Sequence, residues 1–192
     1  MAVPVTGPDL DPGDVQQPRV VLGAGAFLYM LMTALALGWL WLRDRIEVLP
    51  AQAIGQHGPW LAAGLGLAIG WCGAMVFAVL ARRVQKFRAY AALTRRVFND
   101  VGEVAAIAFV LLGAVAEELL FRLAVQDAIG VFGSVAVYVL LHMGIGGAWV
   151  IPVSLLHGLA LGLLVHQGFG LLSSTTANAI MNYLSLRRIQ CT

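Results

Sequence analysis

The sequence predicts an all-α fold, a polytopic membrane bundle of about six transmembrane helices plus one amphipathic interfacial helix. Of the 192 residues, 60% are hydrophobic and 11% are charged, whereas soluble domains carry about 25% charged residues. The charges are also segregated, because no Asp, Glu, Lys or Arg lies between Asp127 and Arg187. Long uncharged stretches are typical of an integral membrane protein, and the length allows one membrane domain.

The predicted spans follow the uncharged stretches in chain order. They cover residues 20–42, 59–81, 104–129, 131–143, 149–166 and about 171–186. A spanning helix needs about 20 apolar residues, and Pro59 suits the first turn of the second one. Pro50 through Gly58 is predicted to be a loop. Residues 1–18 contain prolines and aspartates and are predicted to form a disordered tail, which leaves residues 19–192 as a single membrane domain.

Residues 82–103 are predicted to form the interfacial helix. This segment holds six of the twelve Lys and Arg residues, and its apolar side chains recur at near-helical spacing, as in helices that lie on a membrane surface. Basic loops remain in the cytoplasm, and Arg187 and Arg188 close the last span on the same side. We therefore expect both termini on the cytoplasmic side of the inner membrane. The alternative reading of 82–103 is a solvated connector.

The third predicted span contains a charged cluster, Glu117, Glu118 and Arg122. A charge at the bilayer centre costs about 2.5–3.5 kcal/mol on insertion scales, so such a cluster is a functional-site hypothesis. On a helix, Glu118 and Arg122 are an i,i+4 pair, and Glu117 points about 100° away. Glu117 is then free to act as a general base. The alternative is a buried ion-paired triad that only fixes packing.

Three further polar residues lie in apolar spans. Counted at 1.5 Å per residue, Glu117 lies ~20 Å from the cytoplasmic face, and His142 and Asn178 lie ~15 Å from the other. These depths place Glu117, His142 and Asn178 near one level of a ~30 Å core. Asn178 and Asn182 share a helix face, and their amides suit oxyanion stabilisation. The alternative roles are structural: His142 would be a packed core residue, and Asn178 and Asn182 would link neighbouring helices by hydrogen bonds.

The order of these residues resembles the CPBP family of CAAX proteases and bacteriocin-processing enzymes, the glutamic-type intramembrane endopeptidases. The matching motifs are Glu117-Glu118-Leu-Leu-Phe-Arg122, Tyr138-x-x-x-His142 and Asn178-x-x-x-Asn182. The family patterns are Glu-Glu-x-x-x-Arg, Phe-x-x-x-His and His-x-x-x-Asn. The glycine-rich run from Gly158 to Gly162 is similar to the family's penultimate helix. The resemblance covers residues 104–186, which would be the catalytic core.

The resemblance implies a metal-independent mechanism without a cofactor. Glu117 would activate water with His142, and Asn182 would help to hold the oxyanion, while Glu118 and Arg122 would support the site. Asn178 stands where the family has histidine and cannot shuttle a proton, although its amide can donate a hydrogen bond. His157 is a candidate to replace the missing imidazole.

The expected partners are the lipid bilayer and a peptide or membrane-anchored protein substrate, with no nucleic acid. The substrate class stays open among a prenylated C-terminus, a bacteriocin leader and a C-terminal membrane anchor, and the latter two are favoured. Three other functions are weighed. A non-catalytic immunity or scaffold protein is supported by Asn178. A zinc protease would use Glu117, Glu118, His142 and His157, but no His-Glu-x-x-His helix is present. A transporter is not supported, because no inverted-repeat pattern stands out in the sequence.

Overall fold

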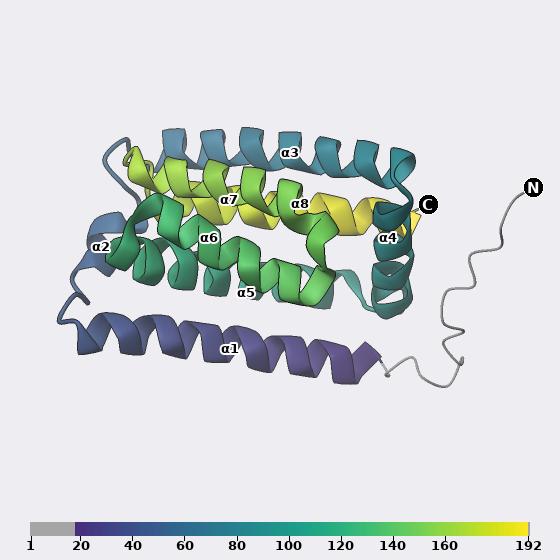
Figure 1. The fold of residues 1–192 in the computed structure, drawn as a ribbon, viewed down its shortest axis with the longest axis horizontal. Helices are drawn as coiled ribbons and strands as arrows, with labels where there is room; N and C mark the ends of the chain where they lie inside the picture. Colours follow the sequence, from purple (N-terminus) through teal and green to yellow (C-terminus); the bar gives the residue numbers. More distant parts are fainter. Residues whose placement is uncertain (1–17, 192) are drawn as a thin grey trace, which may run out of the picture.

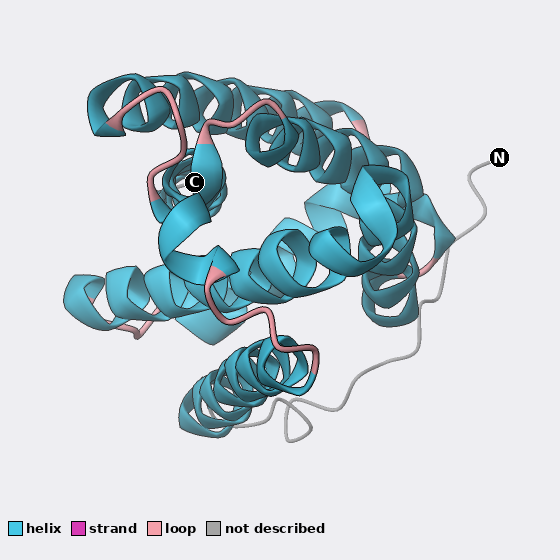
Figure 2. Cartoon of the chain, turned by 90° about the vertical axis from the view of Figure 1, so that its left-hand side faces the viewer, coloured by secondary structure: helices cyan, strands magenta, loops and turns pink. Residues whose placement is uncertain are grey.

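The computed structural model describes residues 18–191, and within this range it contains helices but no strand. Short loops join the helices, as the view along the bundle shows (Figure 2). The elements are α1 (Pro18–Leu42), α2 (Val48–Ala53), α3 (Pro59–Arg83), α4 (Gln85–Phe98), α5 (Glu103–Glu118), the π-helix η1 (Leu119–Val125), α6 (Gln126–Gly146), the 3-10 helix η2 (Ala148–Val150), α7 (Ile151–His166) and α8 (Gly170–Cys191). The all-α prediction is thus confirmed for the described residues.

Four helical segments of the described chain are long and apolar enough to cross a membrane: Val20–Leu42, Pro59–Arg83, Glu103–Gly144 and Ala148–His166. The third has 42 residues, about twice what one crossing needs. Gly130 interrupts it with a φ of 75°, a conformation that glycine adopts without a steric penalty. The chain reverses there, since Ser134 Oγ donates a hydrogen bond to the carbonyl oxygen of Phe121 at 2.5 Å.

Helix α8 forms the core of the bundle. None of its residues from 170 to 190 is exposed, and it packs against α3, α4, α5 and α7. It carries serines, threonines and asparagines and is not among the four apolar segments. A helix enclosed by other helices does not face lipid, so it can hold polar side chains that find partners inside the protein.

A stripe of small residues allows α3 to approach α8 closely. Ala62, Gly66, Gly70 and Ala74 are the buried residues of α3. A Cβ on Gly70 would lie 2.5 Å from the carbonyl oxygen of Ala177 in α8, so only glycine fits there. A spacing of four residues, as between Gly66 and Gly70, is common in glycine-rich spans. In the structure it sets the contact between α3 and α8.

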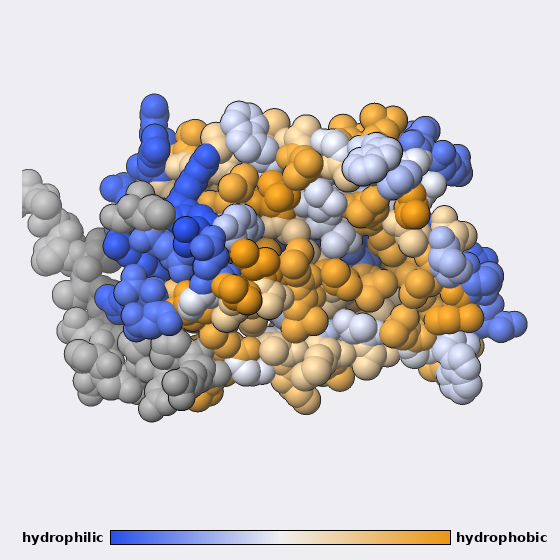
Figure 3. Space-filling view, turned by 180° about the vertical axis from the view of Figure 1, so that it is seen from behind, coloured by the Kyte–Doolittle hydropathy of each residue, from blue (hydrophilic) through white to orange (hydrophobic). Residues whose placement is uncertain are grey.

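The surface has an apolar band between two polar ends (Figure 3). Helix α4 runs across one end, where α1 begins and α8 finishes (Figure 1). Phe87 of α4 is buried and meets Trp149 edge to face at 4.8 Å. The other face of α4 is basic and exposed. At the opposite end, Arg43 and Arg45 both bind Asp127, at 2.9 and 2.7 Å, and tie the chain after α1 to the start of α6.

The structure corrects three details of the sequence prediction and does not test a fourth. The predicted loop from Pro50 to Gly58 overlaps α2, which extends to Ala53. The third span is not one regular α-helix, because η1 replaces it from Leu119 to Val125. The fourth continues beyond Met143, since α6 ends only at Gly146. The predicted tail of residues 1–18 lies outside the described residues except for Pro18, which begins α1.

Candidate active site

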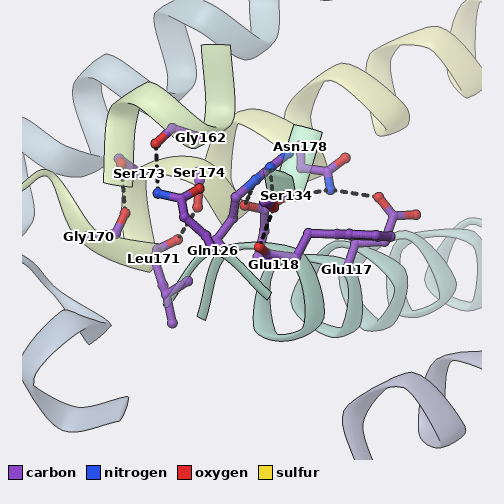
Figure 4. Close-up of polar contacts among 12 residues, drawn as sticks. Glu117, Glu118, Gln126, Ser134, Gly162, Gly170, Leu171, Ser173, Ser174 and Asn178 are labelled. Carbon is purple, nitrogen blue, oxygen red and sulfur yellow. Dashed lines mark hydrogen bonds and ion pairs between the residues drawn. The ribbon is translucent and has the colours of Figure 1, made fainter. Parts of the chain in front are cut away.

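Asn178 joins the two glutamates at the centre of the bundle. Its Nδ2 donates to Glu117 Oε2 at 3.0 Å and to Glu118 Oε1 at 3.3 Å. Figure 4 shows Asn178 of α8 above the α5 turn that carries both carboxylates. The structure therefore brings Glu117 and Asn178 together, and the common membrane depth of Glu117, His142 and Asn178 stays a prediction. Each carboxylate receives one amide hydrogen, which holds the two acidic side chains at fixed positions.

The Glu118–Arg122 pair is confirmed. Arg122 Nε lies 3.4 Å from Glu118 Oε2, and the side chains are 0% and 1% exposed. The pair spans the junction of α5 and η1, and π-helical turns occur frequently at functional sites. Arg122 Nη1 also donates to Ser134 Oγ at 3.3 Å. Glu118 is thus neutralised, whereas Glu117 has no ion-pair partner among the described residues and is only half-buried.

The two asparagines have different hydrogen-bonding capacities. Both amide hydrogens of Asn178 are engaged by carboxylates, and its Oδ1 accepts a hydrogen bond from Asn182 Nδ2 at 2.8 Å. An amide nitrogen carries two hydrogens, so Asn182 keeps one donor with no partner among residues 18–191. Asn178 therefore fixes the position of Glu117 Oε2, and Asn182 is the asparagine that keeps an amide hydrogen for another acceptor.

His142 and His157 both lie beside the ring of Tyr138. Its ring lies 4.0 Å from the His142 ring and 6.2 Å from that of His157. Arg122 Cζ also lies 5.3 Å from the centroid of the Tyr138 ring. His142 Nδ1 is 2.9 Å from the Tyr138 carbonyl oxygen. Because a carbonyl only accepts, Nδ1 carries the hydrogen, and Nε2 of the neutral ring has a free lone pair.

His157 belongs to the same cluster. It lies beside Asn178, and its Nε2 is buried without a hydrogen-bond partner in the described part of the chain. An imidazole from α7 therefore lies next to Asn178 of α8.

Two glycines of α7 make room for the site. A Cβ on Gly158 would lie 3.1 Å from Tyr138 Cδ1, and one on Gly162 would lie 3.2 Å from Gln126 Oε1 and 3.6 Å from Arg122 Nη1. The glycine spacing of this helix therefore accommodates polar side chains. Gln126 Nε2 donates to the Gly162 carbonyl oxygen at 3.0 Å, which fixes α6 against α7 (Figure 4).

Some expected contacts do not form. Within residues 18–191, no hydrogen bond or ion pair joins Glu117 to His142, whose ring instead lies 4.0 Å from that of Tyr138. Nor does the described chain bring three or more His, Cys, Asp or Glu side chains together as metal ligands. The four residues considered as zinc ligands, Glu117, Glu118, His142 and His157, are thus not arranged as a metal site in the described structure.

Sequence reasoning missed three features of this site. Ser134 supports Arg122 and is completely buried, and a serine in an apolar span was the available signal. Gln126 was not singled out, although it is an amide in the third predicted span. The π-helix has no signal in the sequence, because α and π turns use the same residue types.

The chain matches no protein-family model, no curated protein and no solved structure.

Proposed function

We propose that this chain is a glutamic-type intramembrane endopeptidase of the CPBP kind. The observation that carries the proposal is the unequal environment of the two glutamates. Glu118 is paired with Arg122 at 3.4 Å, and Glu117 is held by Asn178 alone at 3.0 Å. A positioned carboxylate without a cationic partner, close to imidazoles and a free amide donor, has the parts required for water activation.

In the proposed reaction, Glu117 takes a proton from water and His142 Nε2 accepts a hydrogen bond from the same molecule. The water oxygen attacks the peptide carbonyl carbon, and the carbonyl oxygen becomes an oxyanion. The free amide hydrogen of Asn182 stabilises that charge. The carbon–nitrogen bond then breaks as Glu117 returns the proton to the departing amine. The products are a carboxylic acid and an amine, and no metal or cofactor takes part.

The proposed membrane arrangement has six crossings. The long segment contributes two crossings because the chain reverses at Gly130, and α8 crosses as the enclosed core helix. The basic helix α4 then lies at the cytoplasmic surface of the inner membrane with both termini, as the distribution of Lys and Arg favours. The substrate would be a peptide leader or the C-terminal membrane anchor of a protein, because the base lies at mid-membrane depth.

The proposal is tested with purified protein in liposomes and a panel of single-span anchor and leader reporters. The unmodified chain should cleave at least one reporter, and Glu117→Gln should abolish cleavage because an amide cannot accept the proton. His142→Ala should lower kcat by about 10²–10⁴-fold. Full activity of Glu117→Gln would refute the mechanism. Inhibition by a phenanthroline chelator that added zinc reverses would favour the metalloprotease instead.

A second function, a non-catalytic immunity or scaffold protein of the same family, is favoured by one observation. Asn178 occupies the position of the family's histidine, and both its amide hydrogens are bound to glutamates. The cluster would then only hold α5 and α8 together. In that case no reporter is cleaved, and Glu117→Gln leaves every phenotype unchanged while Glu118→Gln destabilises the protein.

A further inference from the structure

Tyr29 of α1 lies against the face of α5 that carries Glu117. Its ring is 5.2 Å from the ring of Phe109 in α5. The hydroxyl end of the ring lies over Gly113, because a Cβ on that glycine would be 2.8 Å from Tyr29 Cζ and 2.9 Å from the hydroxyl oxygen. The missing side chain of Gly113 therefore lets the phenol approach α5. Helix α1 lies outside residues 104–186, so the family resemblance assigns Tyr29 no role.

The helical spacing of α5 brings the Glu117 carboxylate back towards this hydroxyl. Phe109, Gly113 and Glu117 follow one another at intervals of four residues, so they lie on one face, with about 5–6 Å between successive Cβ positions. Helical side chains lean towards the N-terminus of their helix, so Glu117 extends over the turn that contains Gly113. The Tyr29 hydroxyl lies over the same turn. The phenol and the carboxylate therefore share one turn of α5.

Each of the two groups keeps a free polar atom that solvent can reach. Glu117 Oε2 accepts from Asn178, whereas the other carboxylate oxygen has no contact in Figure 4 and no hydrogen bond within residues 18–191. The only side-chain hydrogen bond to Tyr29 in the described chain comes from Thr33 and reaches the backbone carbonyl oxygen, so the hydroxyl is free. Both residues are only half-buried, and neither atom is among the sealed, unpaired ones.

We infer that the Tyr29 hydroxyl and Glu117 Oε1 share one water molecule, and that this water attacks the peptide in the proposed reaction. The inference rests on the proposed endopeptidase function and adds a residue of α1 to its site. Two hydrogen bonds of about 2.8 Å through one water join atoms up to ~5.5 Å apart, which suits two groups over one helical turn.

The tyrosine supplies the contact that orients this water. The water donates its two hydrogens to Glu117 Oε1 and His142 Nε2, and the Tyr29 hydroxyl donates to one of its two lone pairs. The second lone pair is then the one directed at the peptide carbonyl carbon. Tyr29 transfers no proton, since Glu117 takes the proton of the water as before. Its hydroxyl therefore acts on the rate of attack and not on the affinity for the substrate.

The first measurement detects the pairing of Tyr29 with Glu117 without any cleavage. The full chain, which has four tyrosines, is labelled with 3-fluorotyrosine and placed in nanodiscs, and Tyr29→Phe identifies the fluorine signal of Tyr29. We expect Glu117→Gln to shift that signal by more than its line width, because the charge facing the hydroxyl is lost. Glu103→Gln is the matched control. Tyr183 donates to Glu103 Oε1 at 2.9 Å, so this change should shift the Tyr183 signal and leave that of Tyr29 in place.

The second measurement uses a reporter that the unmodified chain cleaves. Tyr29→Phe keeps the ring on Phe109 and removes only the hydroxyl. We expect kcat to fall roughly two- to tenfold, the effect of one neutral hydrogen bond, with KM unchanged. Tyr183→Phe removes a hydroxyl that also meets a glutamate, at an exposed position, and should leave kcat unchanged.

Two results would overturn the inference: a Tyr29 fluorine signal that does not respond to Glu117→Gln, or a kcat of Tyr29→Phe equal to that of the unmodified chain. The proposed function fails independently. A shifted Tyr29 signal in a protein that cleaves no reporter would keep the shared water site and remove the protease. Cleavage that Glu117→Gln abolishes and Tyr29→Phe leaves unchanged would keep the protease and remove the tyrosine from its site.

Discussion

Replacing Glu118 by Gln tests the division of roles between the two adjacent glutamates. Glutamine keeps the shape and can still accept the hydrogen bond from Asn178, which lies 3.3 Å from Glu118 Oε1. Only the negative charge opposite Arg122 is lost. The Arg122 side chain is 0% exposed, so its charge cannot be compensated by solvent. We therefore expect Glu118→Gln to act on stability and Glu117→Gln to act on catalysis.

The magnitude follows from the burial of the pair. Loss of one member of a buried ion pair costs about 3–5 kcal/mol, which lowers the folding equilibrium constant by about 10²–10⁴-fold. Glu117 is half-buried and has no cationic partner in the described chain. Its replacement by Gln weakens at most one hydrogen bond, from Asn178 at 3.0 Å. That change should alter the free energy of unfolding by no more than about 1.5 kcal/mol.

The assay is reversible unfolding in mixed micelles, followed by circular dichroism as the fraction of denaturing detergent rises. Glu118→Gln should unfold at a markedly lower fraction than Glu117→Gln. The double variant Glu118→Gln with Arg122→Gln should recover much of the loss, because no uncompensated charge remains. Equal stability of the two single variants, or a double variant that is less stable than Glu118→Gln, would refute this account of the pair.

Three more predictions concern other parts of the chain. Asn178→Ala should lower kcat by roughly 10- to 100-fold, because a hydrogen bond to a charged group contributes about 1.5–3 kcal/mol; unchanged cleavage would remove its positioning role. Gly70→Ala should destabilise the bundle in the same unfolding assay, since its Cβ would meet the Ala177 carbonyl oxygen at 2.5 Å, whereas Gly64→Ala has nothing within 4 Å and should be neutral or stabilising. In a cysteine-free background, Ala92→Cys should react with an impermeant maleimide only from the cytoplasm and Glu47→Cys only from outside; the opposite pattern would invert the proposed topology.

Much of this protein was readable from the local pattern of its residues. Uncharged stretches predicted helices, and the basic amphipathic segment predicted α4, because hydrophobic periodicity and charge are local properties. The Glu118–Arg122 pair was predicted from its spacing of four residues. Counting of depth predicted that Glu117, His142 and Asn178 lie near one level, but it did not predict which of them meet; in the structure a hydrogen bond joins Glu117 to Asn178.

Other features depended on contacts between distant segments. Helix α8 is too polar to be predicted as a lipid-facing helix. It can carry polar side chains because α3, α4, α5 and α7 enclose it. The sequence could not decide how the amide hydrogens of Asn178 are shared, because that depends on the positions of two carboxylates 60 and 61 residues away. The cavity at the α2 end, lined by Gln52, Arg122 and Gly168 among others, also has no sequence signal, since its wall combines residues from five separate elements.

The sequence by itself therefore determined that the chain is a helical membrane protein and that Glu118, Arg122 and Asn178 lie among apolar residues. Those properties follow from the high free-energy cost of placing charges among apolar residues. Only the tertiary structure decided which glutamate is neutralised, which asparagine keeps a free donor and where Arg122 meets a cavity. Hydrogen bonds and ion pairs act over about 3 Å, so their partners are settled by the packing of helices and not by the order of residues.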